Sequence, residues 1–202
     1  MKTAQSPVPR RPYRMRARAV AAEETGARIL DAAVSVFWER PVHDVPLDEV
    51  ARRAGVTVQT VLRRFGSKDA LFAAAVERES ARIERDRDRA QPGSVAEAVR
   101  ILVDHYDDVG DGVLRMLAAE ETTHGLRALV ESGRTAHRRW CSRVFAPTLE
   151  ARTGVRRQRR LAQLVAATDV LTWKLLRRDG GLSRAQTELA MRELLEPLTG
   201  AA

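Results

Sequence analysis

The 202-residue sequence contains one cysteine, Cys141, and few aromatic residues, which make up 4% of the chain. A single thiol excludes an internal disulfide, and without a neighbouring Cys-x-x-Cys pair it excludes a thiolate metal site. No apolar run approaches the roughly 20 residues that span a bilayer. The arginine-rich N-terminal stretch is followed only by a short Ala-Val-Ala-Ala segment, which is not a signal-peptide core. We therefore expect a cytoplasmic protein without a membrane partner.

Catalytic signatures are lacking too, since no G-x-S-x-G, P-loop, G-x-G-x-x-G or H-E-x-x-H pattern occurs. His137 and Cys141 are one helical turn apart, but two ligands without a third fall short of a zinc site, so core packing is the better interpretation. His105 lies among aspartates in the segment 104–108, a combination that resembles an acid/base cluster. Carboxylates on the solvent side of a helix are usually only solvated, and this is the simpler interpretation. We expect no catalytic residue, cofactor or metal, and an enzyme in a helical bundle is a lesser alternative.

Basic residues outnumber acidic ones by 35 to 27, which gives a formal charge of +8 and a pI near 10.8. This balance favours an anionic partner, either nucleic acid or an acidic membrane surface. Residues 1–22 hold six basic residues, three prolines and no acidic residue. Because this segment has little apolar area to bury, the sequence predicts a flexible basic arm.

The rest of the chain has apolar residues at helical spacing, with no alternating strand pattern and no internal repeat. It predicts an all-α fold of about nine helices. One apolar stripe begins at Ile29 and stops before Pro41, and a second follows Pro46, a residue suited to a first helical turn. A short helix is expected after Gly110.

Polar residues placed to cap helices mark where later helices begin. Ser67 is positioned to cap one long helix. Ser94 with Glu97, and Ser183 with Gln186, have the spacing of capping boxes. The first of these boxes follows the linker Gln-Pro-Gly, so a domain boundary is expected nearby.

Residues 54–71 read AGVTVQTVLRRFGSKDAL and combine a turn with a two-faced helix. Gly55 supplies the tight turn, Thr57 is placed to cap the helix, and Val61 and Phe65 fall four residues apart on a buried side. The open side carries Gln59, Thr60 and Arg63. A helix of this kind suits the major groove of DNA, although a helical hairpin with a solvated basic face explains the same charge pattern.

The order of residues resembles the TetR family of bacterial transcriptional repressors. The matching residues are Ile29-Leu30-Asp31-Ala32-Ala33 with Phe37, then Val50-Ala51-Arg52-Arg53-Ala54-Gly55-Val56-Thr57, then Phe65, Ser67-Lys68 and Leu71. The resemblance covers roughly residues 24–76. It implies a helix-turn-helix DNA-binding domain over residues 23–76, whose third helix reads the groove, and a helical effector-binding and dimerisation domain over residues 77–202.

The sequence departs from the family pattern at two places. The family usually has a tyrosine where this chain has Leu62, and a threonine near the second helix where it has Val45-Pro46. Leu62 cannot donate a hydrogen bond, so it either contacts a thymine methyl or loses the contact. Arg63 and Arg64 replace residues that are often histidine or aromatic. Our hypothesis is that these arginines restore affinity lost with the hydroxyl groups.

Double-stranded DNA is therefore the expected partner. The expected contact residues are Thr57, Gln59, Thr60, Leu62, Arg63, Arg64 and Lys68, with Arg14, Arg16 and Arg18 in the arm. Lys68 is expected to touch a phosphate, because a helix N-terminus already favours anions. The arm either enters an adjacent minor groove or follows phosphates, or it is a solvated tail with nonspecific attraction only.

The resemblance also implies a homodimer and an unidentified small-molecule effector bound among the middle helices. The candidate pocket residues are Tyr106, His137, Trp140, Thr168, Asp169 and Trp173. The candidate dimer contacts are Leu164, Thr168, Leu171, Leu175, Met191, Leu194, Leu195 and Leu198. Packing in the core of a single chain is an alternative explanation for the helical spacing of the residues in both sets. The sequence predicts a repressor released from a palindromic operator by its ligand, with a nonspecific DNA or membrane-surface binder as the alternative.

Overall fold

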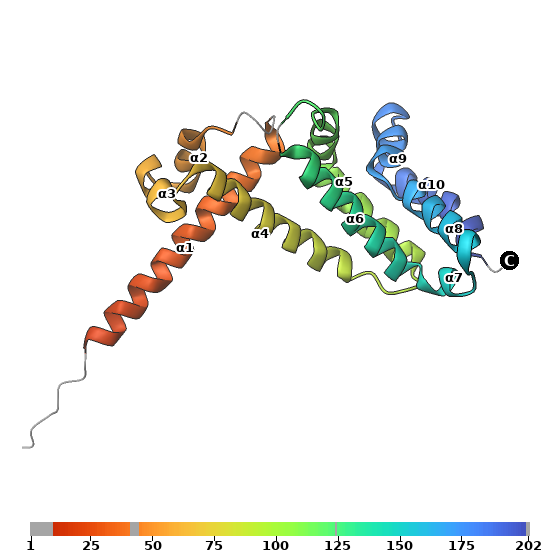
Figure 1. Cartoon of the computed structure of the whole chain (residues 1–202), viewed down its shortest axis with the longest axis horizontal. Helices are drawn as coiled ribbons and strands as arrows, with labels where there is room; N and C mark the ends of the chain where they lie inside the picture. The colour runs from red at the N-terminus through yellow and green to blue at the C-terminus, as the bar shows by residue number, and fades with distance from the viewer. Residues whose placement is uncertain (1–9, 41–44, 124, 201–202) are drawn as a thin grey trace, which may run out of the picture. The chain divides into compact units, whose positions relative to one another are not determined.

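The computed structural model describes residues 10–40, 45–123 and 125–200 (Figure 1). Within these residues the regular structure is entirely helical, so the expected all-α fold is confirmed. Ten α-helices and one π-helical segment are present in the described ranges, against about nine helices expected from the periodicity. Two of the ten, α7 and α9, have only five residues each.

The elements follow one another along the chain with short connections. They are α1 (Arg10–Glu39), α2 (Leu47–Ala54), α3 (Val58–Phe65), α4 (Lys68–Asp88), α5 (Val95–Ala118), α6 (Leu126–Val144), α7 (Ala146–Glu150), α8 (Gly154–Ala167), α9 (Val170–Lys174), η1 (Leu175–Asp179) and α10 (Arg184–Thr199). None of the described helices is both long enough and apolar enough to cross a membrane.

The chain divides into two compact units. The first unit combines residues up to 36 with residues 45–78, and the second combines residues 37–44 with residues 79 onward. Both α1 and α4 have residues in each unit. Each unit has its own apolar core, as expected for segments that bury their hydrophobic faces separately.

The first unit is built on an apolar cluster contributed by α1 to α4. Its buried members include Ile29 and Val36 of α1, Val50 of α2, Val61 of α3 and Leu71 of α4. The short α2 has acidic residues in its first turn and basic residues in its last turn, which complements the helix dipole. These features explain how an eight-residue helix is held in place.

The N-terminal part of α1 corrects one prediction. Residues 10–22 form the beginning of a 30-residue helix, whereas the composition predicted a flexible arm over residues 1–22. The segment extends a helix that is already anchored at Ile29, so no nucleation cost opposes it. Alanine and arginine are strong helix formers, and Pro12 falls in the first turn, where the backbone N–H groups have no helical partner. Residues 1–9 lie outside the described residues.

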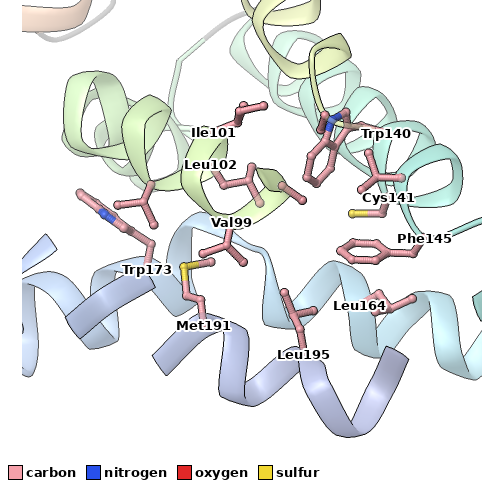
Figure 2. Packing of buried hydrophobic residues seen from close by; sticks show 14 of the residues in the cluster. Val99, Ile101, Leu102, Trp140, Cys141, Phe145, Leu164, Trp173, Met191 and Leu195 are labelled. Carbon is pink, nitrogen blue, oxygen red and sulfur yellow. The ribbon is translucent and has the colours of Figure 1, made fainter. Parts of the chain in front are cut away.

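The second unit packs α5, α6, α8, α9 and α10 around a larger core. Figure 2 shows Val99 and Leu102 of α5 facing Leu164 of α8 and Met191 and Leu195 of α10. All five of these side chains are fully buried. The apolar stripes recognised in the sequence therefore form the inside of this unit.

Two expectations about α5 were wrong. Ser94 makes no side-chain capping hydrogen bond, and Glu97 instead accepts a hydrogen bond from the backbone N–H of Gln91 at 3.0 Å. The helix also continues through Gly110 to Ala118, where a new short helix was expected. A Cβ on Gly110 would come within 2.7 Å of the Trp173 ring, so this glycine allows close packing and does not break the helix.

The other two predicted caps are confirmed. The Ser67 hydroxyl accepts a hydrogen bond from the backbone N–H of Ala70 at 3.1 Å, at the beginning of α4. Ser183 and Gln186 form the complete capping box of α10, with both reciprocal hydrogen bonds present. Local sequence therefore determined these two helix starts.

Candidate nucleic-acid interface

The connection between α2 and α3 is a tight turn with a capped second helix. Gly55 has a left-handed backbone with φ of 68°, and the N–H of Val56 donates to the carbonyl of Ala51 at 2.9 Å. Thr57 follows with an extended backbone, and its hydroxyl accepts a hydrogen bond from the N–H of Thr60 at 3.2 Å. The predicted turn and the predicted cap are both confirmed.

The inner face of α3 fixes the helix against the first unit. Val61 is 1% exposed, and Val58 and Phe65 pack against the same core while partly buried. Arg28 of α1 donates from its Nε to the carbonyl of Ala54 at 3.3 Å, which satisfies the carboxyl end of α2. The helix is therefore braced by apolar contacts on one side and by its neighbours at the turn.

The outer face of α3 carries the predicted groove-reading residues. Gln59 is two residues before Val61, and Arg63 is two residues after it. Two residues correspond to a rotation of about 200° around an α-helix, so both side chains point away from the core that Val61 faces. Both are exposed. Of the predicted set on this side, Thr57, Gln59, Leu62, Arg63, Arg64 and Lys68 are exposed and Thr60 is partly buried. The outer face can therefore approach a ligand as large as a duplex.

Two cations on this surface have no side-chain partner within residues 10–40, 45–123 and 125–200. Among the residues that the structure describes, neither Arg63 nor Lys68 has an ion pair or a hydrogen bond from its side chain. Lys68 is the first residue of α4, beside the unpaired N–H groups of a helix N-terminus. Both side chains can bind an external anion without first breaking an internal contact.

Arg64 has a different position from Arg63. It is three residues after Val61 and returns toward the flank of the helix, where its guanidinium lies against Gly26 of α1. A Cβ built on Gly26 would come 2.8 Å from Nη2 of Arg64. Arg64 thus joins the outer surface of α3 to α1, whereas Arg63 stands at the centre of the open face.

The arginines of α2 are already paired within the protein. Arg52 and Arg53 both donate to Glu49, at 2.8 and 2.7 Å, and their guanidinium groups lower the pKa of Glu49 to about 2. Their charge is therefore offset locally. The side-chain charge left without a partner on this part of the first unit is concentrated on α3 and the beginning of α4.

The predicted arm residues can be placed only in part. Arg16 and Arg18 lie on the N-terminal half of α1 and are exposed. The Arg14 side chain lies outside the described residues, although its backbone belongs to α1. Contact of these residues with DNA stays a prediction.

The six predicted pocket residues form a bonded cluster in the second unit. His137 Nε2 is 3.1 Å from the Thr168 hydroxyl, and the Tyr106 hydroxyl donates to the Thr168 carbonyl at 3.0 Å. Trp173 donates to Asp107 at 3.1 Å, and Asp169 caps α9. All except Asp169 are buried. Whether they bind a ligand stays a prediction, and core packing accounts for the contacts observed.

A cavity of about 280 Å³ lies elsewhere in the second unit, and none of those six residues lines it. Its walls come from the end of α1, from α5 and from the turn after α5: Phe37, Arg40, Gly112, Arg115, Ala118, Ala119 and Thr122. Next to it, the ring of Trp38 packs over Gly112, and the carbonyl of Trp38 accepts a hydrogen bond from Arg115. Sequence periodicity gave no signal for this cavity.

The predicted dimer residues divide into two groups. Leu164, Thr168, Met191 and Leu195 are each 0% exposed and pack inside their own chain, and their contact with a partner stays a prediction. Leu171, Leu175 and Leu194 are 52%, 63% and 47% exposed, and Leu198 is partly buried. Leu164 and Leu171 belong to different helices, because α8 ends at Ala167 and α9 begins at Val170.

Sequence reasoning did not identify Gly26 or Arg28. A glycine inside a helical pattern indicates a close approach by another group, and that signal was present at Gly26. Nothing in the sequence distinguished Arg28 from other exposed arginines on a helix, because its role depends on the turn that it contacts.

Comparisons with known proteins agree with this geometry. Residues 29–75 match the family described as bacterial regulatory proteins, tetR family. The HTH-type transcriptional regulator SrpR of Pseudomonas putida is 50% identical over 50 residues, which is 25% of this chain and 24% of that protein. An HTH-type transcriptional repressor of Mycobacterium tuberculosis is 29% identical over 152 residues, covering 66% of this chain and 79% of the relative.

A solved TetR-like transcriptional regulator from Rhodococcus sp. RHA1 is 26% identical and aligns with a TM-score of 0.60 over 88% of this chain and 97% of that one. The first unit is thus a helix-turn-helix unit of the kind found in bacterial regulators. The match to the tetR-family model is confined to residues 29–75, and the whole chain resembles the fold of the solved TetR-like regulator. The matches to SrpR and to the HTH-type regulator TtgW of the same species cover only 24% and 37% of those relatives' own lengths.

Proposed function

We propose that this protein is a sequence-specific DNA-binding transcriptional regulator, acting in the cytoplasm and without enzymatic activity. The observation that carries the proposal is the outer face of α3, where Gln59 and Arg63 point away from a helix braced from behind by Val61. Side chains of this type match base edges in the major groove, since arginine pairs with guanine and glutamine with adenine. Lys68 adds a phosphate contact.

The regulator binds DNA as a homodimer on a near-palindromic site. Its two copies of α3 are then spaced about 34 to 36 Å apart, or a multiple of that distance, to meet one face of the duplex. The exposed leucines of α9, η1 and α10 supply an apolar surface for the partner. Residues 23–76 are the DNA-binding domain, and residues 77–202 bind the effector and the second copy.

The regulator acts as a repressor that a small molecule releases from its operator. The relative from Mycobacterium tuberculosis is named a repressor, which supports this direction of control. Release requires only a modest coupling between ligand and DNA binding, typically 1 to 3 kcal/mol. The second unit carries the buried polar cluster of Tyr106, His137 and Thr168 as its candidate ligand site.

Selection of bound sequences from random duplex DNA at about 150 mM salt tests the proposal, because nonspecific affinity collapses as ionic strength rises. We expect an enriched palindrome. Arg63→Ala should relax the preference at one base position of the enriched sequence, whereas Arg138→Ala, which removes an exposed arginine of the second unit, should leave the sequence unchanged. Recovery of no preferred sequence would favour a nonspecific basic binder instead.

A further inference from the structure

The guanidinium of Arg87 lies among neutral rings in the second unit. Its Nη1 is 3.4 Å from Nδ1 of His137, and its central carbon is 5.8 Å from the centre of the Trp140 ring. The same charge acts electrostatically on His105 and Tyr106. The cation therefore belongs to the polar cluster that was described above as the candidate ligand site.

The acidic neighbours of Arg87 on α4 are all occupied by other arginines. Glu84 pairs with Arg139 at 2.6 Å. Asp86 pairs with Arg82 at 3.5 Å, and Asp88 pairs with Arg143 at 3.0 Å. No carboxylate pairs with Arg87 in the described part of the chain. Asp169, whose charge also reaches this cluster, caps α9.

One hydrogen-bond donor of Arg87 is also left over. Its Nε is buried without a hydrogen-bond partner among the described residues, a condition shared there only by Nε of Arg192. The Nη1 group is directed at His137, and the Arg87 side chain also hydrogen-bonds to the Tyr106 hydroxyl, so Nε is the donor that stays without a partner. The side of a guanidinium that carries Nε is one on which it holds a carboxylate through two parallel hydrogen bonds.

The rings around Arg87 cannot supply the missing negative charge. Burial, and after it the nearby Arg87 charge, lowers the pKa of His137 to about 3, so this imidazole is neutral at pH 7. The Thr168 hydroxyl donates to the Leu164 carbonyl at 2.7 Å, which leaves it to accept from Nε2–H of His137 and assigns Nδ1 as the acceptor for Arg87. A partly buried cation surrounded by neutral groups is costly unless an anion pairs with it.

We propose that Arg87 binds the carboxylate of a small organic acid, whose apolar body lies against Trp140 and His105. This inference names the chemical class of the effector and rests on the proposed function of the protein as a ligand-responsive regulator. Planar, bidentate recognition of this kind is better served by arginine than by lysine. The aromatic ring beside the guanidinium offers an apolar surface for the rest of the ligand.

Thermal unfolding of the full chain, at constant ionic strength, tests the inference with matched pairs of probes. The pairs are benzoate with benzamide and hexanoate with hexanamide, which differ in charge but scarcely in shape. We expect at least one acid to raise the unfolding midpoint by roughly 3 to 6 °C at about ten times its Kd, and its amide to have no such effect. Equal shifts from acid and amide, or no shift from either acid, would overturn the inference.

Arg87→Gln supplies the second arm of the test, with Arg85→Gln as the matched control on an exposed arginine of the same helix. The acid-specific shift should vanish in Arg87→Gln and persist in Arg85→Gln. Persistence in Arg87→Gln would assign the acid to another site. If Arg87→Gln does not fold, the comparison of acid with amide on the unchanged protein decides the question.

The failure of this inference is distinguishable from failure of the proposed function. Operator binding measured without any added acid tests the regulator alone. A protein that binds a palindrome but ignores every acid contradicts the inference about Arg87 and leaves the regulator intact. A protein that responds to an acid but selects no DNA sequence contradicts the proposed function.

Discussion

The guanidinium of Arg64 on α3 lies directly against Gly26 of α1, so that a Cβ on residue 26 would come 2.8 Å from Nη2 and 2.9 Å from Nε. Both contacts are with the far end of a flexible side chain, which can move away. The absence of a side chain at residue 26 therefore determines where Arg64 lies. The two residues connect the backbone of α1 to the surface that faces the proposed operator.

Gly26→Ala should separate stability from DNA binding. Alanine favours a helix interior over glycine by about 0.5 to 1 kcal/mol, so the unfolding free energy should stay level or rise. Operator affinity should fall because the guanidinium of Arg64 is displaced, and we expect a fall of similar size in Arg64→Ala. Gly133→Ala is the matched control, since a Cβ there meets no atom within 4 Å. An operator affinity unchanged by Gly26→Ala would show that the position of Arg64 is irrelevant to binding.

Arg63→Ala and Lys68→Ala should weaken operator binding in different ways. If Arg63 reads a guanine, its loss costs about 1 to 3 kcal/mol and relaxes preference at one base position. Loss of Lys68 should weaken all sequences alike and reduce the salt slope by about 1. Titrations on operator and scrambled duplexes at several salt concentrations make the distinction. Equal losses on both duplexes for Arg63→Ala would reassign that residue to the backbone.

Leu175→Glu should disrupt the proposed homodimer. Leu175 is 63% exposed in the protomer, so a glutamate there leaves the protomer core intact but places a charge in the partner contact. Val155→Glu is the control, because Val155 is 73% exposed and lies outside the predicted interface. Sedimentation at micromolar concentration should give a monomer for the first variant and a dimer for the second. A dimer in both would place the interface elsewhere.

The unfolding free energy should decrease as the pH falls below about 6.5, partly because of His137. The folded protein lowers the pKa of this residue to about 3, chiefly by burial, so between pH 3 and 6.5 the unfolded state binds the extra proton. The stabilisation is fully present above pH 6.5 and is lost by about 1.4 kcal/mol per pH unit within that window.

Urea unfolding at pH 7, 6 and 5 measures this dependence, and the slope should be smaller in His137→Gln. Burial also lowers the pKa of His105 well below its ordinary value, so His105→Gln should flatten the slope in the same direction. Identical slopes in the parent and in both variants would mean that other groups cause the acid sensitivity.

Much of the first unit could be predicted from the sequence because its signals are local. Gly55 and Thr57 specify a turn and a cap through their own backbone and hydroxyl, and Val61 and Phe65 specify a face through spacing alone. The role of Arg64 could not be predicted, because it depends on α1, which is about forty residues earlier in the chain.

The second unit was harder to predict because its signals depend on packing partners. Leu164 and Leu171 are both apolar residues at helical spacing, yet one is fully buried and the other is 52% exposed. Gly110 resembled a helix breaker, although it lies where the Trp173 ring approaches α5. Ser94 and Glu97 had capping-box spacing, but Glu97 bonds the preceding linker. Periodicity identified the apolar residues but not their partners.

The break between α8, which ends at Ala167, and α9, which begins at Val170, separates residues under different constraints. Residues before it, such as Leu164, are constrained by the interior of their own chain. Residues after it, such as Leu171 and Leu175, face outward and can vary without a compensating change inside. A substitution at an outward position can therefore alter a surface that a second copy would contact, while the interior of the chain keeps its packing.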